Sequence, residues 1–206
     1  MDYIKNTINF YDQNVDEYIK NTTNLQNKDW LDKFISYLPK NGSVLDIGCA
    51  FGRDTDFFAS NKYVTTGIDL SQKMIDKARS SVPDAKFHVM NMLDLNFKNK
   101  SFDGVWCSAT LLHLNKVDAL KALKEMKRVL KASGVLYINL KKGSGEKVIT
   151  DDRYDNAKKF YSYYCEKEIK DMLSEHKFEI LDFVLEENPI QEYVNTGIIF
   201  LIAKNK

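Results

Sequence analysis

The 206-residue sequence is poor in cysteine, histidine and net charge. Its three cysteines include no Cys-x-x-Cys pair, which argues against a disulfide framework and a zinc site. The three histidines are widely spaced, so we expect no metal ion. Unpaired cysteines fit a reducing, cytoplasmic location. A formal net charge of +1 gives no strong attraction to nucleic acid or to an anionic membrane.

Long apolar runs are also missing. No stretch approaches the roughly 18 apolar residues that suggest a membrane span. The first residues, MDYIKNTINFYDQ, lack the apolar centre of a signal peptide. We therefore expect no membrane partner. Hydrophobic residues nevertheless make up 44% of the chain and aromatic residues 12%, enough for a buried core, and the length favours one domain over 1–206.

From residue 43 onward, apolar segments alternate with segments of helical spacing. Strands are expected at 43–47, 63–69, 86–90, 102–107 and 134–140, and helices at 53–60, 71–80, 116–131 and 166–175. This alternation predicts an α/β fold with a mainly parallel sheet. Two further strands, 178–187 and 196–203, are separated only by a short loop containing Pro189. They should pair antiparallel and place an antiparallel strand at the edge of the sheet.

Two regions lie outside the alternation. The N-terminal part, 1–38, has helical spacing over 1–20 and 28–38 and is expected to form helices beside the sheet. The segment 141–164 fits no clean period, and we interpret it as a long irregular loop. It leaves the carboxyl end of the 134–140 strand, where open α/β sheets bind ligands, so it is a candidate functional loop.

The stretch VLDIGCAFGRD, residues 44–54, is a glycine-containing loop between a strand and a helix. It contains only Gly48 and Gly52, so it matches neither the dinucleotide fingerprint nor the P-loop. The carboxylate of Asp46 would repel phosphate but could accept hydrogen bonds from an ammonium group. Ala50 stands where many such loops have glycine. Because alanine is costly at positive φ, we predict a negative φ there, with the methyl group beside the ligand.

Asp69 ends the second expected strand in the stretch TTGIDLS. A carboxylate at this place typically accepts hydrogen bonds from the hydroxyls of a ribose. The alternative is that Asp69 only helps to cap the following helix, which Ser71 could do alone.

Four successive motifs, VLDIGCAFGRD, GIDLSQKMIDKAR, HVMNMLDLNFKNKSFDGVWCSATLLHL and LKEMKRVLKASGVLYI, resemble those of class I S-adenosylmethionine-dependent methyltransferases. The resemblance covers about residues 40–140 and is greatest to small enzymes of the ubiquinone/menaquinone-biosynthesis-like group. It implies a Rossmann-like, seven-stranded mixed sheet with helices on both faces and the last strand antiparallel. It also implies S-adenosyl-L-methionine as cofactor, a helical lid at 1–38 and an acceptor-site loop at 141–164.

The resemblance also implies a set of cofactor-binding residues: Tyr11, Asp46, Gly48, Cys49, Ala50, Gly52, Arg53, Asp69, Leu70, Met74, Asn91, Met92, Leu93, Cys107 and Ser108. In this scheme Asp69 holds the ribose, and Leu70 and Met74 lie against the adenine. Arg53 could pair with the cofactor carboxylate or could simply be solvated. The family usually has aspartate at Asn91, whose amide oxygen can still accept from the adenine amino group.

Methyl transfer to an acceptor by in-line displacement needs positioning and exclusion of water, and needs no metal. His113 is either a general base or a hydrogen-bonded structural residue beneath the cofactor. Candidate acceptor-site residues are Tyr18, Lys142, Tyr161 and Tyr163. The chain has no N-P-P-Y-like tetrapeptide and no Pro-Cys pair, which favours a small-molecule acceptor. A tRNA acceptor, a non-catalytic cofactor-binding module and a nicotinamide-dependent oxidoreductase remain as alternatives.

Overall fold

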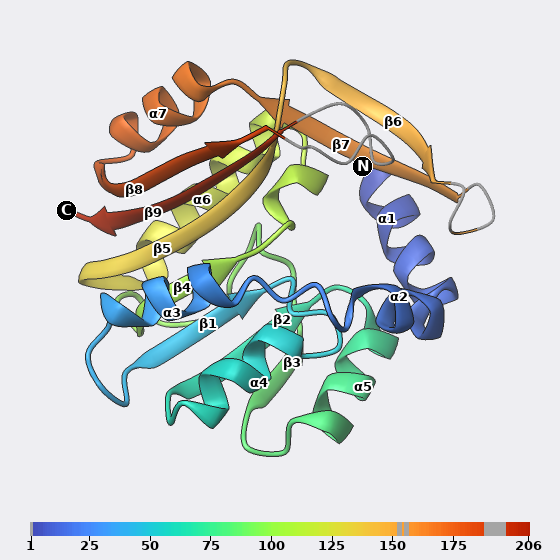
Figure 1. Ribbon diagram of the computed structural model, residues 1–206, viewed down its shortest axis with the longest axis horizontal. Helices are drawn as coiled ribbons and strands as arrows, with labels where there is room; N and C mark the ends of the chain where they lie inside the picture. The colour runs from blue at the N-terminus through green and yellow to red at the C-terminus, as the bar shows by residue number, and fades with distance from the viewer. Residues whose placement is uncertain (1, 152–153, 155–156, 188–196) are drawn as a thin grey trace.

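The structure is a computed structural model that describes residues 2–151, 154, 157–187 and 197–206. Five parallel strands form the centre of the sheet in the order β3-β2-β1-β4-β5. Their bounds are β1 Ser43–Ile47, β2 Val64–Asp69, β3 Lys86–Val89, β4 Phe102–Cys107 and β5 Leu130–Lys142. The expected α/β fold with a Rossmann-like mixed sheet is confirmed (Figure 1).

Helices cover both faces of this sheet. On one face, α3 (Lys28–Ser36) and α4 (Arg53–Ser60) enclose an aromatic cluster in which the Trp106 and Tyr137 rings stack at 3.6 Å. On the other face, α6 (Lys116–Val129) and α7 (Glu166–Glu175) pack on the aliphatic side chains of the same strands. Successive residues of a strand thus point to opposite faces of the sheet and pack in the two different cores.

The helix α5 (Gln72–Ser81) follows β2 and begins where the sequence indicated. The Ser71 side chain accepts a hydrogen bond from the Met74 N–H at 3.1 Å, so Ser71 is the expected N-cap. Four other expected elements, 43–47, 53–60, 102–107 and 166–175, have the bounds that the sequence predicted.

The last strand, β9 (Ile198–Asn205), is antiparallel as expected, but it does not lie at the edge of the sheet. It pairs with β5 on one side and with β8 (Phe178–Glu186) on the other, so β8 is the edge strand. The residues 199–203 are buried throughout, which suits a strand covered on both sides, whereas β8 is largely half-buried. The expected loop at Pro189 lies outside the described residues.

The prediction of an irregular loop over 141–164 is wrong. This segment forms a β-hairpin of β6 (Glu146–Asp151) and β7 (Ala157–Tyr164), paired from Glu146↔Ser162 to Asp151↔Ala157. The buried positions of β7 include Lys159 and Ser162, so polar residues interrupt the apolar alternation that would have revealed a strand.

The N-terminal segment forms α1 (Asp2–Gln13) and α2 (Val15–Thr22), separated at Asn14. Figure 1 shows α1 between the hairpin and α5, at the end of the sheet where the parallel strands finish. Hydrogen bonds fix it there: the Tyr3 hydroxyl donates to Asp118 at 2.5 Å, and the Ser71 hydroxyl donates to Asp12 at 2.5 Å. Helix α1 therefore covers the carboxyl ends of the strands, as the expected lid would.

Among the helices of the described residues, none has the combination of length and apolarity needed to cross a membrane.

The packing of α3 on the sheet leaves no room for a side chain at Gly104 in β4. An added Cβ would lie 2.7 Å from Phe34 Cζ and 3.0 Å from Leu38 Cδ1. We predict that Gly104→Ala lowers the free energy of unfolding by about 1–3 kcal/mol through overpacking, measured by urea denaturation. In a Phe34→Leu background, which removes the closest atom, the same change should cost less. An equal cost in both backgrounds would contradict this explanation.

Candidate functional site

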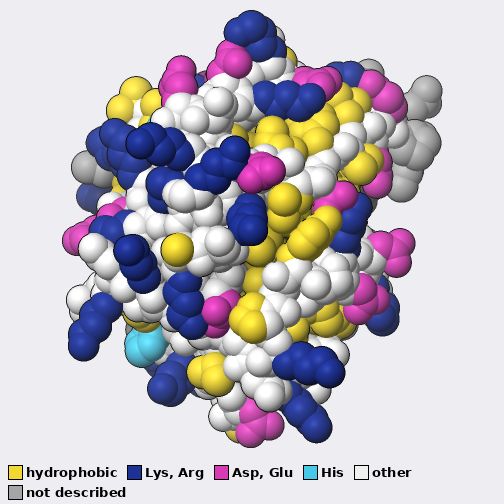
Figure 2. Space-filling model, turned by 90° about the vertical axis from the view of Figure 1, so that its left-hand side faces the viewer, with side chains coloured by type: hydrophobic (Ala, Val, Ile, Leu, Met, Phe, Trp, Pro, Cys, Tyr) yellow, Lys and Arg dark blue, Asp and Glu magenta, His cyan; other side chains and the backbone are white. Residues whose placement is uncertain are grey.

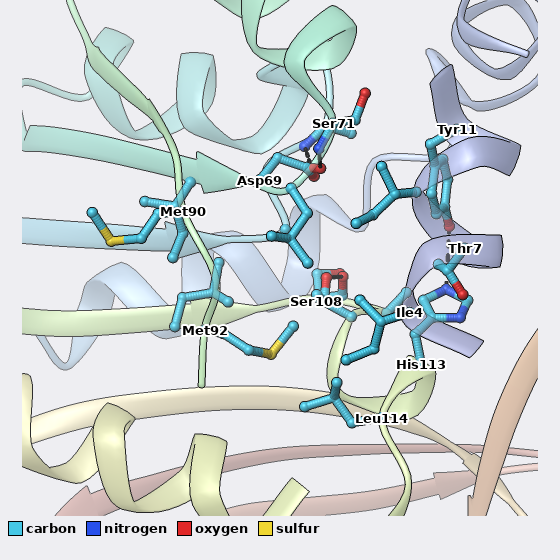
Figure 3. Close-up of a pocket in the computed structure, with 18 of the residues that line it drawn as sticks. Ile4, Thr7, Tyr11, Asp69, Ser71, Met90, Met92, Ser108, His113 and Leu114 are labelled. Carbon is cyan, nitrogen blue, oxygen red and sulfur yellow. Dashed lines mark hydrogen bonds between the residues drawn. The ribbon is translucent and has the colours of Figure 1, made fainter. Parts of the chain in front are cut away.

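A cavity lies beneath α1 at the carboxyl ends of β1, β2 and β4 (Figure 3). Figure 3 shows Asp69 and Ser71 on one side, the α1 residues Thr7 and Tyr11 on another, and Met90 and Met92 across from α1. The full lining is Ile4, Thr7, Ile8, Tyr11, Tyr18, Ile47, Gly48, Ala50, Ile68, Asp69, Leu70, Ser71, Met90, Met92, Ser108, Ala109, Thr110, His113 and Leu114. The site is therefore mainly apolar, with a few polar groups from different elements.

The loop after β1 turns sharply at the floor of this cavity. The Gly48 and Cys49 N–H groups both donate to the Ile68 carbonyl, at 2.8 and 3.0 Å, which anchors the loop to β2. Gly48 has φ of 73°, and a Cβ there would lie 2.1 Å from Thr110 Oγ1. Only glycine combines this conformation with this close approach. Gly52, at φ of 88°, then starts α4.

The prediction of a negative φ at Ala50 is wrong, because its φ is 47°, in the left-handed region. The cause is the hydrogen bond that this conformation permits: the Ala50 N–H donates to Asp69 Oδ2 at 3.0 Å. A hydrogen bond to a carboxylate contributes about 1.5–3 kcal/mol, enough to offset the roughly 1–2 kcal/mol cost of left-handed backbone. Ala50 does line the cavity, as expected for a residue beside a ligand.

Asp69 orders the turn after β2 and also lines the cavity. Its Oδ1 accepts from the Ser71 N–H at 2.9 Å and its Oδ2 from Ala50, while the carboxylate borders the cavity. Burial raises the pKa of Asp69 above its usual range, although the N–H groups of Ser71, Ala50 and Leu70 oppose this. Each carboxylate oxygen can accept more than one hydrogen bond, so acceptor capacity remains for a ligand.

Asp46 and Arg53 do not border the cavity. Asp46 is 2% exposed and accepts a hydrogen bond from the Thr55 hydroxyl at 2.6 Å. Burial and the neighbouring Asp54 carboxylate raise the pKa of Asp46. Arg53 pairs with Asp54 at 2.9 Å and donates to the Thr22 carbonyl at 2.8 Å. In this structure both residues form hydrogen bonds inside the protein, at the two ends of the loop after β1.

Arg53 also connects helix α2 to the sheet. Asp54, its ion-pair partner, accepts a hydrogen bond from the Trp106 indole at 3.0 Å. The Thr22 carbonyl belongs to the last residue of α2. The end of the lid, the start of α4 and the centre of β4 are thus joined through one guanidinium group.

The remaining expected cofactor residues divide into two groups. Leu70, Met92 and Ser108 line the cavity with Gly48, Ala50 and Asp69. The residues that do not line it are Cys49, Gly52, Met74, Asn91, Leu93 and Cys107. The Asn91 amide oxygen accepts from the Leu93 N–H at 3.0 Å, a hydrogen bond within its own turn.

His113 and Tyr11 meet at the roof of the cavity. His113 Nδ1 lies 3.0 Å from the Phe160 carbonyl oxygen, and its Nε2 lies 3.1 Å from the Tyr11 hydroxyl. A carbonyl can only accept, so Nδ1 carries the proton and Nε2 accepts from Tyr11. Burial is the main cause that lowers the pKa of His113 to about 4, and the charges of Lys159 and Lys141 add to it. His113 is therefore a neutral, weakly basic imidazole.

The four expected acceptor-site residues are only partly brought together. Tyr18 lines the cavity. The Tyr161 ring packs 4.9 Å from the His113 ring, one layer behind the lining, and Tyr163 is buried at 2% exposure. Lys142 forms an ion pair with Glu187 instead of facing the cavity.

Ten lining residues were not among those expected from the sequence, and all are apolar or small and polar: Ile4, Thr7, Ile8, Ile47, Ile68, Ser71, Met90, Ala109, Thr110 and Leu114. For α1 a signal existed, because Ile4, Ile8 and Tyr11 have helical spacing and define one face. That spacing predicts a buried face, but it does not show what the face covers.

Three basic residues of the 116–131 segment are held in ion pairs within or beside it. Lys121 pairs with Asp118, Arg128 with Glu125 and Lys131 with Asp103. Figure 2 shows a face of the molecule on whose left half Lys and Arg side chains outnumber the acidic ones. The described residues contain no group of three or more His, Cys, Asp or Glu placed to hold a metal ion.

Comparisons with known proteins agree with this geometry. Residues 44–134 match the family model described as a methyltransferase domain. A probable methyltransferase of Aspergillus luteorubrus is 35% identical over 118 residues, 50% of this chain and 41% of that protein. The 2-methyl-6-phytyl-1,4-hydroquinone methyltransferase of Synechocystis is 33% identical over 105 residues, 49% of this chain and 32% of that protein. The matches thus span less than half the length of these relatives.

Solved structures share the fold. A SAM-dependent methyltransferase of Methanosarcina mazei has a TM-score of 0.75 at 24% identity, covering 82% of this chain and 95% of that one. The 1,6-didemethyltoxoflavin-N1-methyltransferase of Burkholderia thailandensis, with bound S-adenosylhomocysteine, has a TM-score of 0.69 at 18% identity, covering 87% and 77%. Residues 44–134 are thus similar to methyltransferase domains, and the chain has the fold of these solved methyltransferase structures. Membership of the ubiquinone/menaquinone-like group stays a prediction.

The strained backbone at Ala50 gives a stability prediction. Ala50→Gly should raise the free energy of unfolding by about 0.5–1 kcal/mol, because relief of left-handed strain exceeds the entropy that glycine adds to the unfolded chain. Thermal denaturation should show a melting temperature higher by about 2–4 °C. The matched control Ala59→Gly, within α4, should instead lower stability. A less stable Ala50→Gly protein would show that the alanine methyl group contributes more than the strain costs.

The buried neutral imidazole gives a pH prediction. The pKa of His113 is lowered to about 4 on folding, from an ordinary value of 6.5. The unfolded chain then binds more protons between these values, so stability is fully present above pH 6.5 and falls as pH drops toward 4. The unfolding free energy should fall by about 1–2 kcal/mol more between pH 7 and pH 5 in the wild type than in His113→Gln. Parallel urea titrations check this, and equal losses in both proteins would contradict it.

Proposed function

We propose that the chain binds S-adenosyl-L-methionine in the cavity beneath α1 and transfers its methyl group to a small-molecule acceptor. The observation that carries the proposal is the Asp69 carboxylate. It stands at the end of β2, is oriented by the N–H groups of Ala50 and Ser71, and borders an otherwise apolar cavity. Such a carboxylate is suited to the two hydroxyls of a ribose.

The rest of the cavity fits the other parts of the cofactor. Ile68, Leu70 and Met92 provide apolar walls for a flat base. Gly48 allows close approach of a ligand to the backbone at the end of β1. When bound, S-adenosylmethionine supplies a methyl group already activated on a sulfonium. The task left for this chain is to position the partners and exclude water.

We propose that Asp46 and Arg53 hold the loop and do not contact the cofactor. Both are engaged inside the protein, with Thr55 and with Asp54 and the Thr22 carbonyl. For Arg53 to reach a ligand carboxylate, it would have to leave the end of α2. The cofactor ammonium group would then be held by other acceptors of the floor, such as backbone carbonyls near Ser108.

The acceptor would lie between the cofactor site and α1. This part of the cavity is formed by Ile4, Thr7, Ile8 and Leu114, with the Tyr11–His113 pair beside them. We propose that His113 orients groups by hydrogen bonding, since a pKa of about 4 makes it a poor general base at neutral pH. This site suits an acceptor whose attacking atom already carries a free lone pair or readily loses its proton.

A small molecule is favoured over tRNA for two reasons. Helix α1 is bonded to Asp118 on one side and to Ser71 on the other, so it spans the mouth of the cavity. Three of the five basic residues of α6 are paired with acidic neighbours, which reduces the charge available to phosphates. We further propose that 1–206 acts as one domain in the cytoplasm, where its free cysteines would stay reduced.

The proposal predicts a specific binding defect. Asp69→Ala should weaken binding of S-adenosylhomocysteine by about 10- to 100-fold, because it removes charged hydrogen-bond acceptors from the ribose site. Isothermal titration calorimetry measures this directly. Asp76→Ala, on the exposed side of α5, is the matched control and should bind normally.

Two further measurements make the result interpretable. Thermal denaturation checks that Asp69→Ala is folded, since Asp69 also holds Ala50 and Ser71. Titration of the wild type with NAD tests the oxidoreductase alternative and should give no binding. Unchanged affinity of Asp69→Ala for S-adenosylhomocysteine would remove the ribose assignment.

A further inference from the structure

A lysine of the β6–β7 hairpin is buried where the hairpin meets α1. Lys159 on β7 is 3% exposed, and its Nζ lies 3.1 Å from Asp151 Oδ2 on β6. Lysine is rarely buried to this extent unless its charge is paired. The ion pair with Asp151 explains how the charge of Lys159 can be buried, but it does not explain why the side chain is buried against α1.

Aromatic rings surround the same ammonium group. Nζ lies 3.8 Å from the centroid of the Phe10 ring and 4.4 Å from that of Tyr154. Phe10 belongs to α1 and is itself 3% exposed, and its ring meets the Tyr154 ring edge-on at 4.9 Å. A cation over desolvated aromatic faces is attracted more strongly than one at the surface. Lys159 therefore joins α1 to the hairpin.

The neighbouring residues on both elements belong to the hydrogen-bonded pair at the roof of the cavity. Tyr11 follows Phe10 on α1, and its hydroxyl meets His113 Nε2. Phe160 follows Lys159 on β7, and its carbonyl oxygen holds His113 Nδ1. Two successive residues of β7 thus hold the pair. Phe160 bonds to His113 directly, and Lys159 contacts Phe10, the residue next to Tyr11.

From this arrangement we propose that Lys159 is a positioning residue for methyl transfer. Its ammonium group holds Phe10 and thereby keeps α1 at the height where Tyr11 bonds His113 and the cavity is covered. Lys159 is not part of the cavity lining, so it acts through the lid and not on the reactants. The role rests on the proposed function, because it is the cofactor and acceptor cavity that α1 covers.

The test compares hydrogen exchange of α1 amides in variants that remove the cation without leaving a buried charge. Lys159→Met alone would strand Asp151, so the main variant is Lys159→Met/Asp151→Asn. We expect α1 amides to exchange about tenfold faster than in the wild type, while α4 and α6 amides are unchanged. Lys159→Arg, which keeps the charge, should restore slow exchange. Lys158→Met, the same change at the exposed neighbour, should have no effect.

A second variant approaches the contact from the lid. Phe10→Leu keeps an apolar side chain but removes the aromatic face, and it should also speed α1 exchange. It serves if the double variant does not fold. In nitrogen-correlated NMR spectra, the slowed exchange of the His113 Nδ1 proton should be lost together with α1 protection. Exchange of α1 amides at the wild-type rate in the folded variants would overturn the proposal.

Calorimetry with S-adenosylhomocysteine separates this inference from the proposed function. Loosening of the lid should weaken its binding about tenfold in the double variant, and the Arg variant should recover it. If the wild type does not bind S-adenosylhomocysteine, the proposed function fails, while accelerated α1 exchange would still show the contact that Lys159 makes. If binding is normal and α1 exchange does not respond, the positioning role alone fails.

Discussion

The carboxylate of Asp69 connects the parts on which the site depends. It accepts from the Ala50 N–H in the loop after β1 and from the Ser71 N–H in the turn after β2. Two crossover connections are therefore aligned by one half-buried acid, and the cavity floor lies between them. The same bonds explain why Ala50 tolerates a left-handed backbone and why the carboxylate faces the cavity in a fixed orientation.

Local patterns were sufficient to predict the five parallel strands and the loops that form the floor of the cavity. Residues such as Gly48, Asp69 and Ser71 act through the backbone next to them, and such short-range chemistry can be recognised in a sequence. The φ of Ala50 could not be predicted in this way, because it depends on a hydrogen bond to Asp69 at the end of the neighbouring strand β2. The lining contributed by α1 was hidden for a similar reason: its apolar spacing shows a buried face but not its partner.

The hairpin was missed because its buried positions do not look like a core. Lys159 and Ser162 are buried, yet the first is satisfied by Asp151 and the second donates to the Leu114 carbonyl at 2.6 Å. These partners come from outside β7, so periodicity alone cannot identify the strand. In this fold the segment 141–164 supports α1. Its polar buried residues therefore belong to its contacts beside the cavity.

The position of β9 bears on how the chain is made. Its partner β5 is synthesised long before it, and β9 fills the space between β5 and the edge strand β8. On the ribosome, one side of β5 keeps unpaired backbone groups and uncovered apolar side chains until residues 198–205 have emerged. This exposed edge is a template for wrong pairing with another nascent chain. The sheet between β5 and β8 is therefore complete only after residues 198–205 have been synthesised.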